Sequence, residues 1–275
     1  MAILVIDSTK KGLSLNFKEL YQYRDLFLTL TYRDLRVRYA QTLLGFLWAL
    51  LQPLATLLIF TLIFGTALEV DTGGIPYPVF ALCGMSAWTY FAFVMSNAGN
   101  SIIGAQGMIK KIYFPRLIIP LSKACVGLVD YLIVSLFLVF VFIIYGTVPS
   151  SNIIFLPIFI LLTVVSALSI GIWLSALTVR FRDFQHLVPF MVQFGIYVTP
   201  IAFPSEMIIS RLPQWLSAFY YLNPMAGVVE GIRWSLLGGS FLHPFTFISF
   251  FIVLVMFISG LFYFRKVEKT MADIV

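Results

Sequence analysis

Charged residues are scarce in this 275-residue chain. Asp, Glu, Lys and Arg make up 11% of it, against about 25% in a typical soluble domain. Hydrophobic residues make up 60%, and the mean hydropathy is +0.98. This balance excludes an ordinary water-soluble globule, and it excludes intrinsic disorder, which requires low hydrophobicity and high net charge. Because a membrane-spanning helix needs roughly 20 apolar residues, the chain holds enough of them for several such helices.

Cysteine and histidine are equally rare, with two of each. Cys83 and Cys125 lie inside apolar runs, which favours buried thiols over a disulfide framework. His186 and His243 fall on opposite sides of the membrane in the topology given below, so no two-histidine metal site is expected in one chain. The stretch Met1–Lys11 has no apolar core of signal-peptide length, so no cleaved export signal is expected.

Signatures of catalysis are missing as well. The chain has no GxxxxGK[ST] loop, so it is not expected to bind nucleotide phosphates in that way. No Ser-His-acid set is suggested, and titratable groups do not concentrate near one membrane face. The sequence therefore predicts a protein without enzymatic activity, catalytic residues or a bound metal.

Six apolar segments of spanning length are present, and their continuous apolar character favours helices over a transmembrane barrel. Together they predict an all-α integral membrane protein. The predicted spans are 45–68, 78–104, 118–145, 153–179, 187–203 and 245–264.

In a membrane protein, the excess of basic residues behind the net charge of +6 indicates which loops face the cytoplasm, because cytoplasmic loops are enriched in Lys and Arg. Sixteen basic residues fall on one side of the predicted topology and two, Arg211 and Arg233, on the other. Both termini are therefore expected in the cytoplasm. This divides the chain into a cytoplasmic leader (1–44), a transmembrane domain (45–264) and a cytoplasmic tail (265–275). Nucleic acid is not an expected partner.

The leader carries a helical pattern of its own. Lys18, Gln22, Asp25, Thr29, Arg33 and Arg36 recur at steps of three and four, which puts them on one face of a helix. Apolar residues occupy the other face. Such a helix is expected to lie in the membrane interface. A soluble helix packed on a partner is the alternative.

The loop 204–244 is too long for a plain connector. Asn223-Pro224 is a good helix start and Gly238-Gly239 a good stop, so a helix too short to span is expected over Met225–Leu237. A second short helix is expected in Pro213–Tyr221. The two predict a re-entrant or interfacial hairpin at the outer leaflet. Gly227 and Gly231 form a GxxxG step, which permits close helix contact or arises by chance.

Asp130 is the one charge deep in a predicted span, about twelve residues into the third segment. An acid in this position is a proton or cation site in one interpretation. In the other it is a structural group that bonds a neighbouring helix or faces a watery cavity. No partner for it is evident in the other spans, which favours the structural interpretation.

The second span carries the most informative pattern, a face that is polar and aromatic together. The first span offers a weaker companion face. Rings cover the apolar C–H faces of sugars, and amides and hydroxyls exchange hydrogen bonds with sugar hydroxyl groups. Helix packing with polar side chains between the helices is the alternative. The predicted channel-lining residues are Trp48, Gln52, Thr56, Ser86, Thr89, Tyr90, Phe93, Asn97 and Asn100.

Several short motifs, in order along the chain, are similar to those of a known family. Arg33–Tyr39, Leu44–Trp48 with Gln52-Pro53, Lys110–Arg116, Pro120–Ser122, Arg180–Asp183, Thr199-Pro200, Asn223–Met225 and Gly231–Arg233 carry the similarity. The chain resembles the permease subunit of polysaccharide ABC exporters, the type-2 ABC membrane proteins that export O-antigen, capsule and teichoic acid. The resemblance covers about residues 20–265.

The resemblance implies a homodimer that works with two separate ATP-binding subunits, which hold the ATP and Mg. It also implies the transport of an undecaprenyl-diphosphate-linked polysaccharide across the bacterial inner membrane. Recognition of the lipid diphosphate is expected from Arg33, Arg36 and Arg38, for which interface anchoring or an Asp34–Arg38 pair is the alternative. Coupling to the ATPase is expected from Lys110, Lys111, Tyr113, Phe114, Pro115 and Arg116, and the outer gate from Trp215, Tyr220, Tyr221, Asn223, Pro224, Glu230 and Arg233.

Two other functions remain open from the sequence. One is a type-2 ABC exporter of a small amphiphile or drug, which shares the architecture. The other is a proton-coupled carrier or a lipid-modifying enzyme centred on Asp130, whose activity would not depend on an ATPase.

Overall fold

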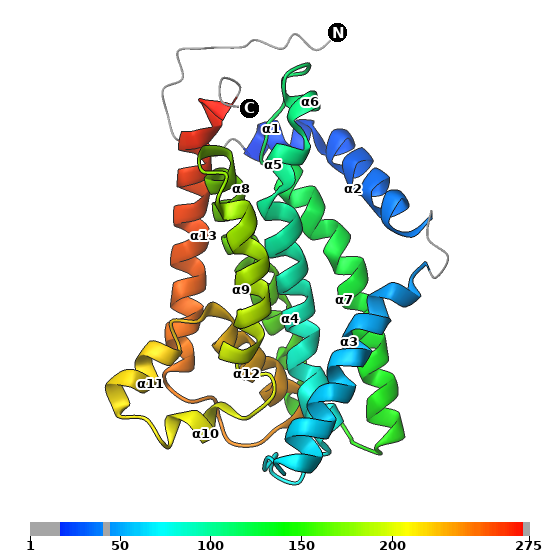
Figure 1. Ribbon diagram of the computed structural model, residues 1–275, viewed down its shortest axis with the longest axis vertical. Coiled ribbons are helices and arrows are strands. Elements are labelled where there is room, and N and C mark those ends of the chain that lie inside the picture. Colours follow the sequence, from blue (N-terminus) through cyan, green and yellow to red (C-terminus); the bar gives the residue numbers. More distant parts are fainter. Residues whose placement is uncertain (1–16, 41–44, 272–275) are drawn as a thin grey trace.

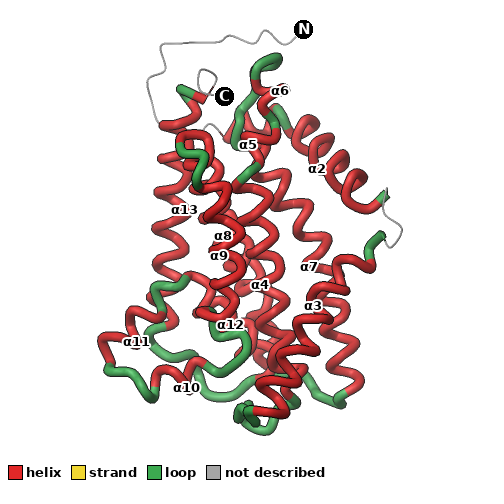
Figure 2. Tube along the Cα trace, viewed as in Figure 1, coloured by secondary structure: helices red, strands yellow, loops and turns green. Residues whose placement is uncertain are grey.

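A computed structural model describes residues 17–40 and 45–271. Within these ranges the chain forms helices and loops and no strand (Figure 2). The described ranges leave out Lys10, Lys11, Leu44 and residues 272–275.

Five helical segments in the described part are long and apolar enough to cross a membrane. Helix α4, which lies at the centre of the bundle in Figure 1, has far more of its surface buried within the protein than the other four. The five segments are α3 with η1 (Leu47–Ala67), α4 (Tyr77–Gly99), α7 (Ile118–Ile144), η2 with α8 (Ser151–Arg180) and α13 (Thr246–Glu268).

The predicted fifth span, 187–203, corresponds to α9 (Phe184–Val198), which has 15 residues and is too short to qualify by itself. The helix ends because Thr199 precedes Pro200, and a residue before proline is driven out of the helical conformation. Thr199 is extended, with φ −85° and ψ 142°. Helix α9 packs against α4 and α8 and leads back toward the end of the molecule that holds α10, α11 and α12 (Figure 1).

Three of the predicted spans depart from one continuous α-helix in the structure. The first begins as an α-helix (Leu47–Phe60) and continues as a π-helix, η1 (Thr61–Ala67). The second, predicted to run without interruption to residue 104, breaks at Asn100, and α5 (Ser101–Gly104) follows. In the fourth, a 3₁₀ turn, η2 (Ser151–Phe155), precedes α8 (Leu156–Arg180).

The leader forms two helices, α1 (Phe17–Gln22) and α2 (Arg24–Tyr39), separated at Tyr23. Helix α2 packs against α7 and slopes away from the bundle axis (Figure 1). Its inward face buries Leu30, while Leu28 and Tyr32 remain exposed on the outside.

The loop after α9 contains α10 (Ser205–Ile209), α11 (Gln214–Tyr220) and α12 (Pro224–Leu237). The predicted boundaries of α12 are confirmed. The Asn223 side chain accepts a hydrogen bond from the Met225 N–H at 3.0 Å, and Gly238 ends the helix with φ +77°.

The GxxxG step of α12 makes two different close contacts. A Cβ on Gly227 would lie 2.8 Å from the Ser249 side chain of α13. A Cβ on Gly231 would lie 2.0 Å from the Phe159 ring of α8. The absence of side chains at these two positions therefore lets α12 sit within the bundle, against both α8 and α13.

Candidate functional site

A cavity with a volume of about 660 Å³ lies between α3, α4, α7 and α9, with α2 at its edge. Below it is called the main cavity. The side chains that line it combine aromatic rings with amide and hydroxyl groups. They include Arg38, Trp48, Gln52, Thr56, Trp88, Thr89, Phe93, Asn97, Asp130, Gln193 and Tyr197.

Six of the nine residues predicted to line a channel meet in the main cavity, from two helices that are consecutive in the chain. They are Trp48, Gln52 and Thr56 of α3 and Thr89, Phe93 and Asn97 of α4. Helix α9 adds Gln193 and Tyr197, which the sequence analysis did not select.

The other three predicted residues lie elsewhere. Tyr90 is 1% exposed and faces α7, where its hydroxyl donates to the Ala124 carbonyl at 3.3 Å. Ser86 is buried and donates to the Cys83 carbonyl at 2.8 Å. Asn100 faces a second, smaller cavity. The predicted face spans a wide sector of α4, and the edge of that sector that holds Tyr90 packs against α7.

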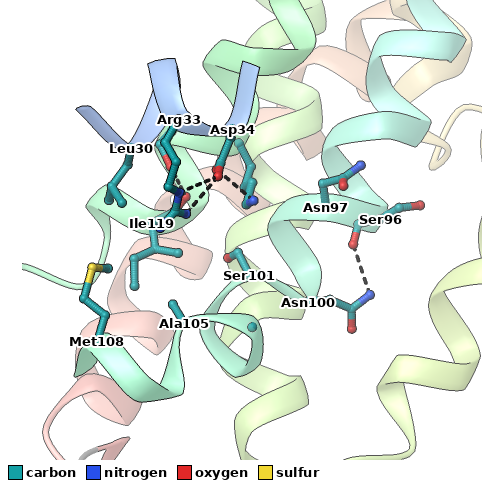
Figure 3. A pocket seen from close by; sticks show the side chains of 13 residues that line it. Leu30, Arg33, Asp34, Ser96, Asn97, Asn100, Ser101, Ala105, Met108 and Ile119 are labelled. Atoms are coloured by element: carbon teal, nitrogen blue, oxygen red, sulfur yellow. Dashed lines mark hydrogen bonds and ion pairs between the residues drawn. The ribbon is translucent and has the colours of Figure 1, made fainter. Parts of the chain in front are cut away.

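The second cavity, of about 320 Å³, lies between α2, α4, α5 and α7 (Figure 3). Asn100 donates to the Ser96 carbonyl at 3.0 Å, but its Oδ1 is buried with no hydrogen-bond partner among the described residues. Ser96 and Asn97 line both cavities, so this part of α4 separates the two spaces.

One wall of the second cavity is an ionic group centred on Asp34 of α2 (Figure 3). Its carboxylate accepts from Arg33 at 2.8 Å and pairs with Lys123 of α7 at 2.8 Å. Burial raises the pKa of Asp34, but the hydrogen bonds and positive charges of Lys123 and Arg33 outweigh it, so the net shift is downward. Asp34 is therefore held as a carboxylate that joins α2 to α7.

A second ionic group joins the same two helices inside the main cavity. Arg38 Nη2 lies 2.6 Å from Asp130 Oδ2, and the Tyr39 hydroxyl donates to Asp130 Oδ1. The Arg38 guanidinium lies over the Phe93 ring, 4.5 Å from its centroid. Asp130 thus has a partner that the sequence analysis missed, because that partner comes from the leader rather than from another span. The alternative Asp34–Arg38 pair is wrong, since each of these residues pairs with α7 instead.

The three arginines proposed for diphosphate recognition point to different places. Arg33 lines the second cavity and Arg38 the main cavity. Arg36 lies with Thr29 and Tyr32 in an exposed groove on α2.

The loop between α5 and α7 contains α6 (Gln106–Ile109) and the residues predicted to couple to an ATPase. Lys110, Lys111, Ile112 and Tyr113 are exposed. Phe114, by contrast, is buried in a core cluster with residues of α8 and α13.

The buried end of this loop is tied to the last turn of α13. The Arg116 backbone N–H donates to Glu268 Oε1 at 2.8 Å, and the Arg116 guanidinium donates to the Glu268 carbonyl. The Glu268 carboxylate also pairs with Arg265 at 2.9 Å. The loop therefore presents an exposed tip on an anchored base.

Arg233 organises the opposite end of the molecule. Although buried, it donates to the carbonyls of Phe80, Pro200 and Ile201, and it lies 3.6 Å from the centroid of the Phe80 ring. These bonds hold the turn after α9 against the start of α4. They satisfy the charged group with backbone acceptors, as burial requires.

Glu230, one turn before Arg233, is the acceptor of a second polar group. The Tyr221 hydroxyl donates to it at 2.9 Å and the Thr246 hydroxyl at 3.1 Å. Burial raises the pKa of Glu230, and hydrogen bonds from Ser205, Tyr221 and Thr246 oppose part of that rise. Of the other predicted gate residues, Trp215 is exposed and Asn223 caps α12, where Pro224 is the first residue. The Tyr220 hydroxyl is buried without a partner among the described residues.

A sequence signal for the α2–α7 contacts does exist. Lys123, Gly127 and Asp130 recur at steps of four and three on α7, and Asp34 and Arg38 are one turn apart on α2 with the complementary signs. Gly127 lies on the same stripe, where a Cβ would be 2.6 Å from the Phe93 ring.

The apolar helices define a multi-pass membrane protein built around a polar cavity. Over residues 25–237 the sequence matches the ABC-2 type transporter family, and the chain belongs to that family.

Relatives of the chain include O-antigen export permeases and a polysialic acid transport protein. It is 32% identical to the O-antigen export system permease protein RfbA of Klebsiella pneumoniae, over 91% of this chain and 95% of that protein. It is 27% identical to RfbA of Myxococcus xanthus, over 78% and 82%. It is 26% identical to the polysialic acid transport protein KpsM of Escherichia coli, over 82% and 89%.

Proposed function

We propose that this chain is the permease of an ATP-driven exporter that moves an undecaprenyl-diphosphate-linked polysaccharide across the bacterial inner membrane. The observation that carries the proposal is the main cavity, in which rings and amides from three helices face one space. Such a lining suits a sugar chain, because rings stack on C–H faces and amides bond hydroxyls. The relatives named as O-antigen and polysialic acid transporters support the same class of cargo.

The topology in this proposal has six crossings, with α9 and the turn after it completing the fifth. An even number of crossings puts both termini on one side, the side with sixteen of the eighteen basic residues. Helices α1 and α2 then lie at the cytoplasmic interface, and α10, α11 and α12 form the outer hairpin. The exposed apolar side chains Leu28 and Tyr32 on α2 support contact with lipid.

A second copy of the chain completes the conduit. Trp48 and Tyr197 both line the main cavity, yet they are 56% and 59% exposed in a single chain. Large rings that remain this exposed beside a polar cavity are expected to meet a partner surface. A facing copy would enclose the cavity between the two chains.

Two ATP-binding subunits supply the energy, and they hold the ATP and Mg. The exposed loop tip at Lys110, Lys111 and Tyr113 is the surface offered to them, while Phe114, Pro115 and Arg116 anchor it. Arg38 is the arginine placed to meet the lipid diphosphate in the conduit, with Arg33 and Arg36 along its approach. Guanidinium forks suit phosphate oxygens.

At the outer end, the hairpin is the proposed gate. Arg233 holds the turn after α9, and Glu230 with Tyr221 holds the start of α12 to α13. Trp215, Tyr220, Asn223 and Pro224 belong to the same hairpin.

The carrier centred on Asp130 is disfavoured because the carboxylate that would bind a transported proton or cation already has two partners, Arg38 on Oδ2 and the Tyr39 hydroxyl on Oδ1. An exporter of small amphiphiles shares the fold, and only its cargo separates it from the proposal.

The test of the function is the fate of the glycan in cells that lack the chain. We expect lipid-linked glycan to accumulate inside and surface glycan to disappear, with restoration by the wild-type gene and by Leu136→Ala, which alters an exposed α7 residue outside the cavity. Unchanged surface glycan together with sensitivity to small amphiphiles would instead support the drug exporter.

A further inference from the structure

The Arg38–Asp130 pair stands inside the main cavity rather than beside it. Both side chains line the cavity, Arg38 with 38% of its side chain exposed and Asp130 with 13%. Asp130 lies close to the middle of α7, a membrane-spanning candidate, where an acid is costly and needs an explanation.

A role in only holding α2 against α7 does not explain this ion pair well. Helices α2 and α7 are already joined by Asp34 and Lys123, one turn earlier on α2. A second ion pair, with its acid near the middle of the spanning helix α7, adds a desolvation cost that its attraction often fails to recover, and apolar packing there is commonly as stable.

The surroundings allow the partner of Arg38 to change. The guanidinium is held over the Phe93 ring, and this contact does not depend on the carboxylate. The Phe93 ring is itself fixed against Gly127 of α7. The Tyr39 hydroxyl donates to Asp130, so the carboxylate keeps one hydrogen bond when the guanidinium leaves. Arg38 and Asp130 therefore each keep a contact whether they are paired with each other or separated.

We propose that Arg38 and Asp130 form an exchange site for a phosphate ester, in which the guanidinium takes up a substrate phosphate and Asp130 is the internal anion that this phosphate displaces. The proposal rests on the proposed function, because a lipid-linked diphosphate is the phosphate that the conduit would receive. A phosphate or diphosphate accepts two parallel bonds from a guanidinium and carries at least the charge of the carboxylate it replaces. The return of Asp130 to Arg38 then favours release of the lipid.

The exchange site predicts that substitutions at Asp130 and Arg38 change the affinity for the diphosphate in opposite directions. A purely structural pair does not predict this. Removing the charge of Asp130 frees the guanidinium from its competitor, so Asp130→Asn is expected to bind the diphosphate roughly fivefold more tightly. Removing the guanidinium takes away the ligand, so Arg38→Gln is expected to bind about tenfold more weakly. A structural pair predicts a loss in both variants, because each leaves one ion unpaired.

The experiment uses the permease with its ATP-binding subunits in phosphatidylcholine nanodiscs, and the readout is equilibrium binding of undecaprenyl diphosphate. Undecaprenol, which lacks phosphate, serves as the ligand control, and neither substitution should change its binding. Arg24→Gln removes a positive charge from the other end of α2 and is expected to bind the diphosphate like the wild type. Asp130→Glu keeps the internal anion and is likewise expected to retain wild-type affinity, which covers the case in which Asp130→Asn does not fold.

Weaker binding in both Asp130→Asn and Arg38→Gln, or stronger binding in Asp130→Glu, would overturn the exchange site while leaving the proposed function intact. Wild-type binding of phosphatidylglycerol as tight as that of undecaprenyl diphosphate, with the opposite effects preserved, would support the exchange site and contradict the proposed cargo. Inorganic diphosphate that binds without the lipid, with the same opposite effects, would support recognition of the head group alone.

Discussion

Buried polar side chains in the described part of the protein are satisfied mainly by backbone and hydroxyl partners. Arg233 bonds three carbonyls at a turn, and Glu230 accepts from two hydroxyls between α12, α13 and the loop before α12. These groups fix the hairpin because losing one partner leaves another polar atom buried and unpaired. Single substitutions at such sites test the arrangement directly.

Glu230→Gln is expected to flatten the dependence of stability on pH. The pKa of Glu230 is raised above its ordinary value of 4.5 by burial, so the folded state holds the proton more tightly than the unfolded state. Its contribution to stability is therefore present below that value and is lost as the pH rises through the raised pKa. Thermal unfolding in detergent at pH about 5 and about 8 measures the slope.

Glu230→Ala is the matched variant. It leaves the Tyr221 and Thr246 hydroxyls without their acceptor, which costs about 1–3 kcal/mol at either pH. A glutamine variant that keeps the wild-type slope would contradict the assignment of this pH dependence to Glu230.

Gly231→Ala is expected to destabilise the protein by about 1–3 kcal/mol, because overpacking forces side chains out of their preferred positions. A Cβ there would lie 2.0 Å from the Phe159 ring, whereas a Cβ on Gly107 would meet nothing within 4 Å. Thermal unfolding of Gly231→Ala and Gly107→Ala measures the difference. Equal melting temperatures would show that the close contact of α12 with α8 is absent.

At the scale of helices, local signals predict boundaries well and lengths less well. Asn223-Pro224 and Gly238 placed α12 to within one residue, because caps act through neighbouring atoms. Apolar composition alone extended the fifth span through Pro200, although the helix ends at Val198. The break at Asn100 and the π-helix after Phe60 have no comparable signal, since each depends on the packing of whole helices.

The ionic contacts of α2 show the limit of sequence reasoning about the site. Arg38 and Asp130 are 92 residues apart, and only the docking of the leader on α7 brings them together. The sequence shows a row of charged residues on α2 and another on α7. It does not show that these two rows face each other. The lining of the main cavity was predicted in part because α3 and α4 carry their own polar faces.

In the loop between α5 and α7, an exposed residue, Ile112, lies two positions from a buried one, Phe114. Substitutions at the two positions therefore separate an effect on subunit association from an effect on stability. Ile112→Asp is expected to weaken association with the ATP-binding subunit while leaving the melting temperature of the isolated permease unchanged, because Ile112 is exposed. Phe114→Ala is expected to cost about 3–5 kcal/mol of stability, because it empties a buried position. Co-purification and thermal unfolding report the two effects. Full association in Ile112→Asp would move the contact surface away from this loop.

For the whole molecule, composition already predicts an all-helical membrane protein, and the charge asymmetry predicts its orientation. The arrangement that makes a conduit cannot be predicted in the same way, because α9 reaches the cavity formed by α3 and α4 from about 90 residues further along the chain. The sequence therefore did not predict Gln193 and Tyr197 as lining residues. It predicted Tyr90 as one, although that side chain is buried and does not line the main cavity.

The most direct test of the central claim is photocrosslinking of the polysaccharide to the main cavity during transport. A photoreactive residue at Gln52 or Asn97, which line the cavity, is compared with one at Leu136, which is exposed on α7 and does not line it. In a complex stalled during export, we expect glycan adducts at Gln52 and Asn97 and none at Leu136. Active export without adducts at the two cavity positions, or with equal adducts at Leu136, would contradict the account.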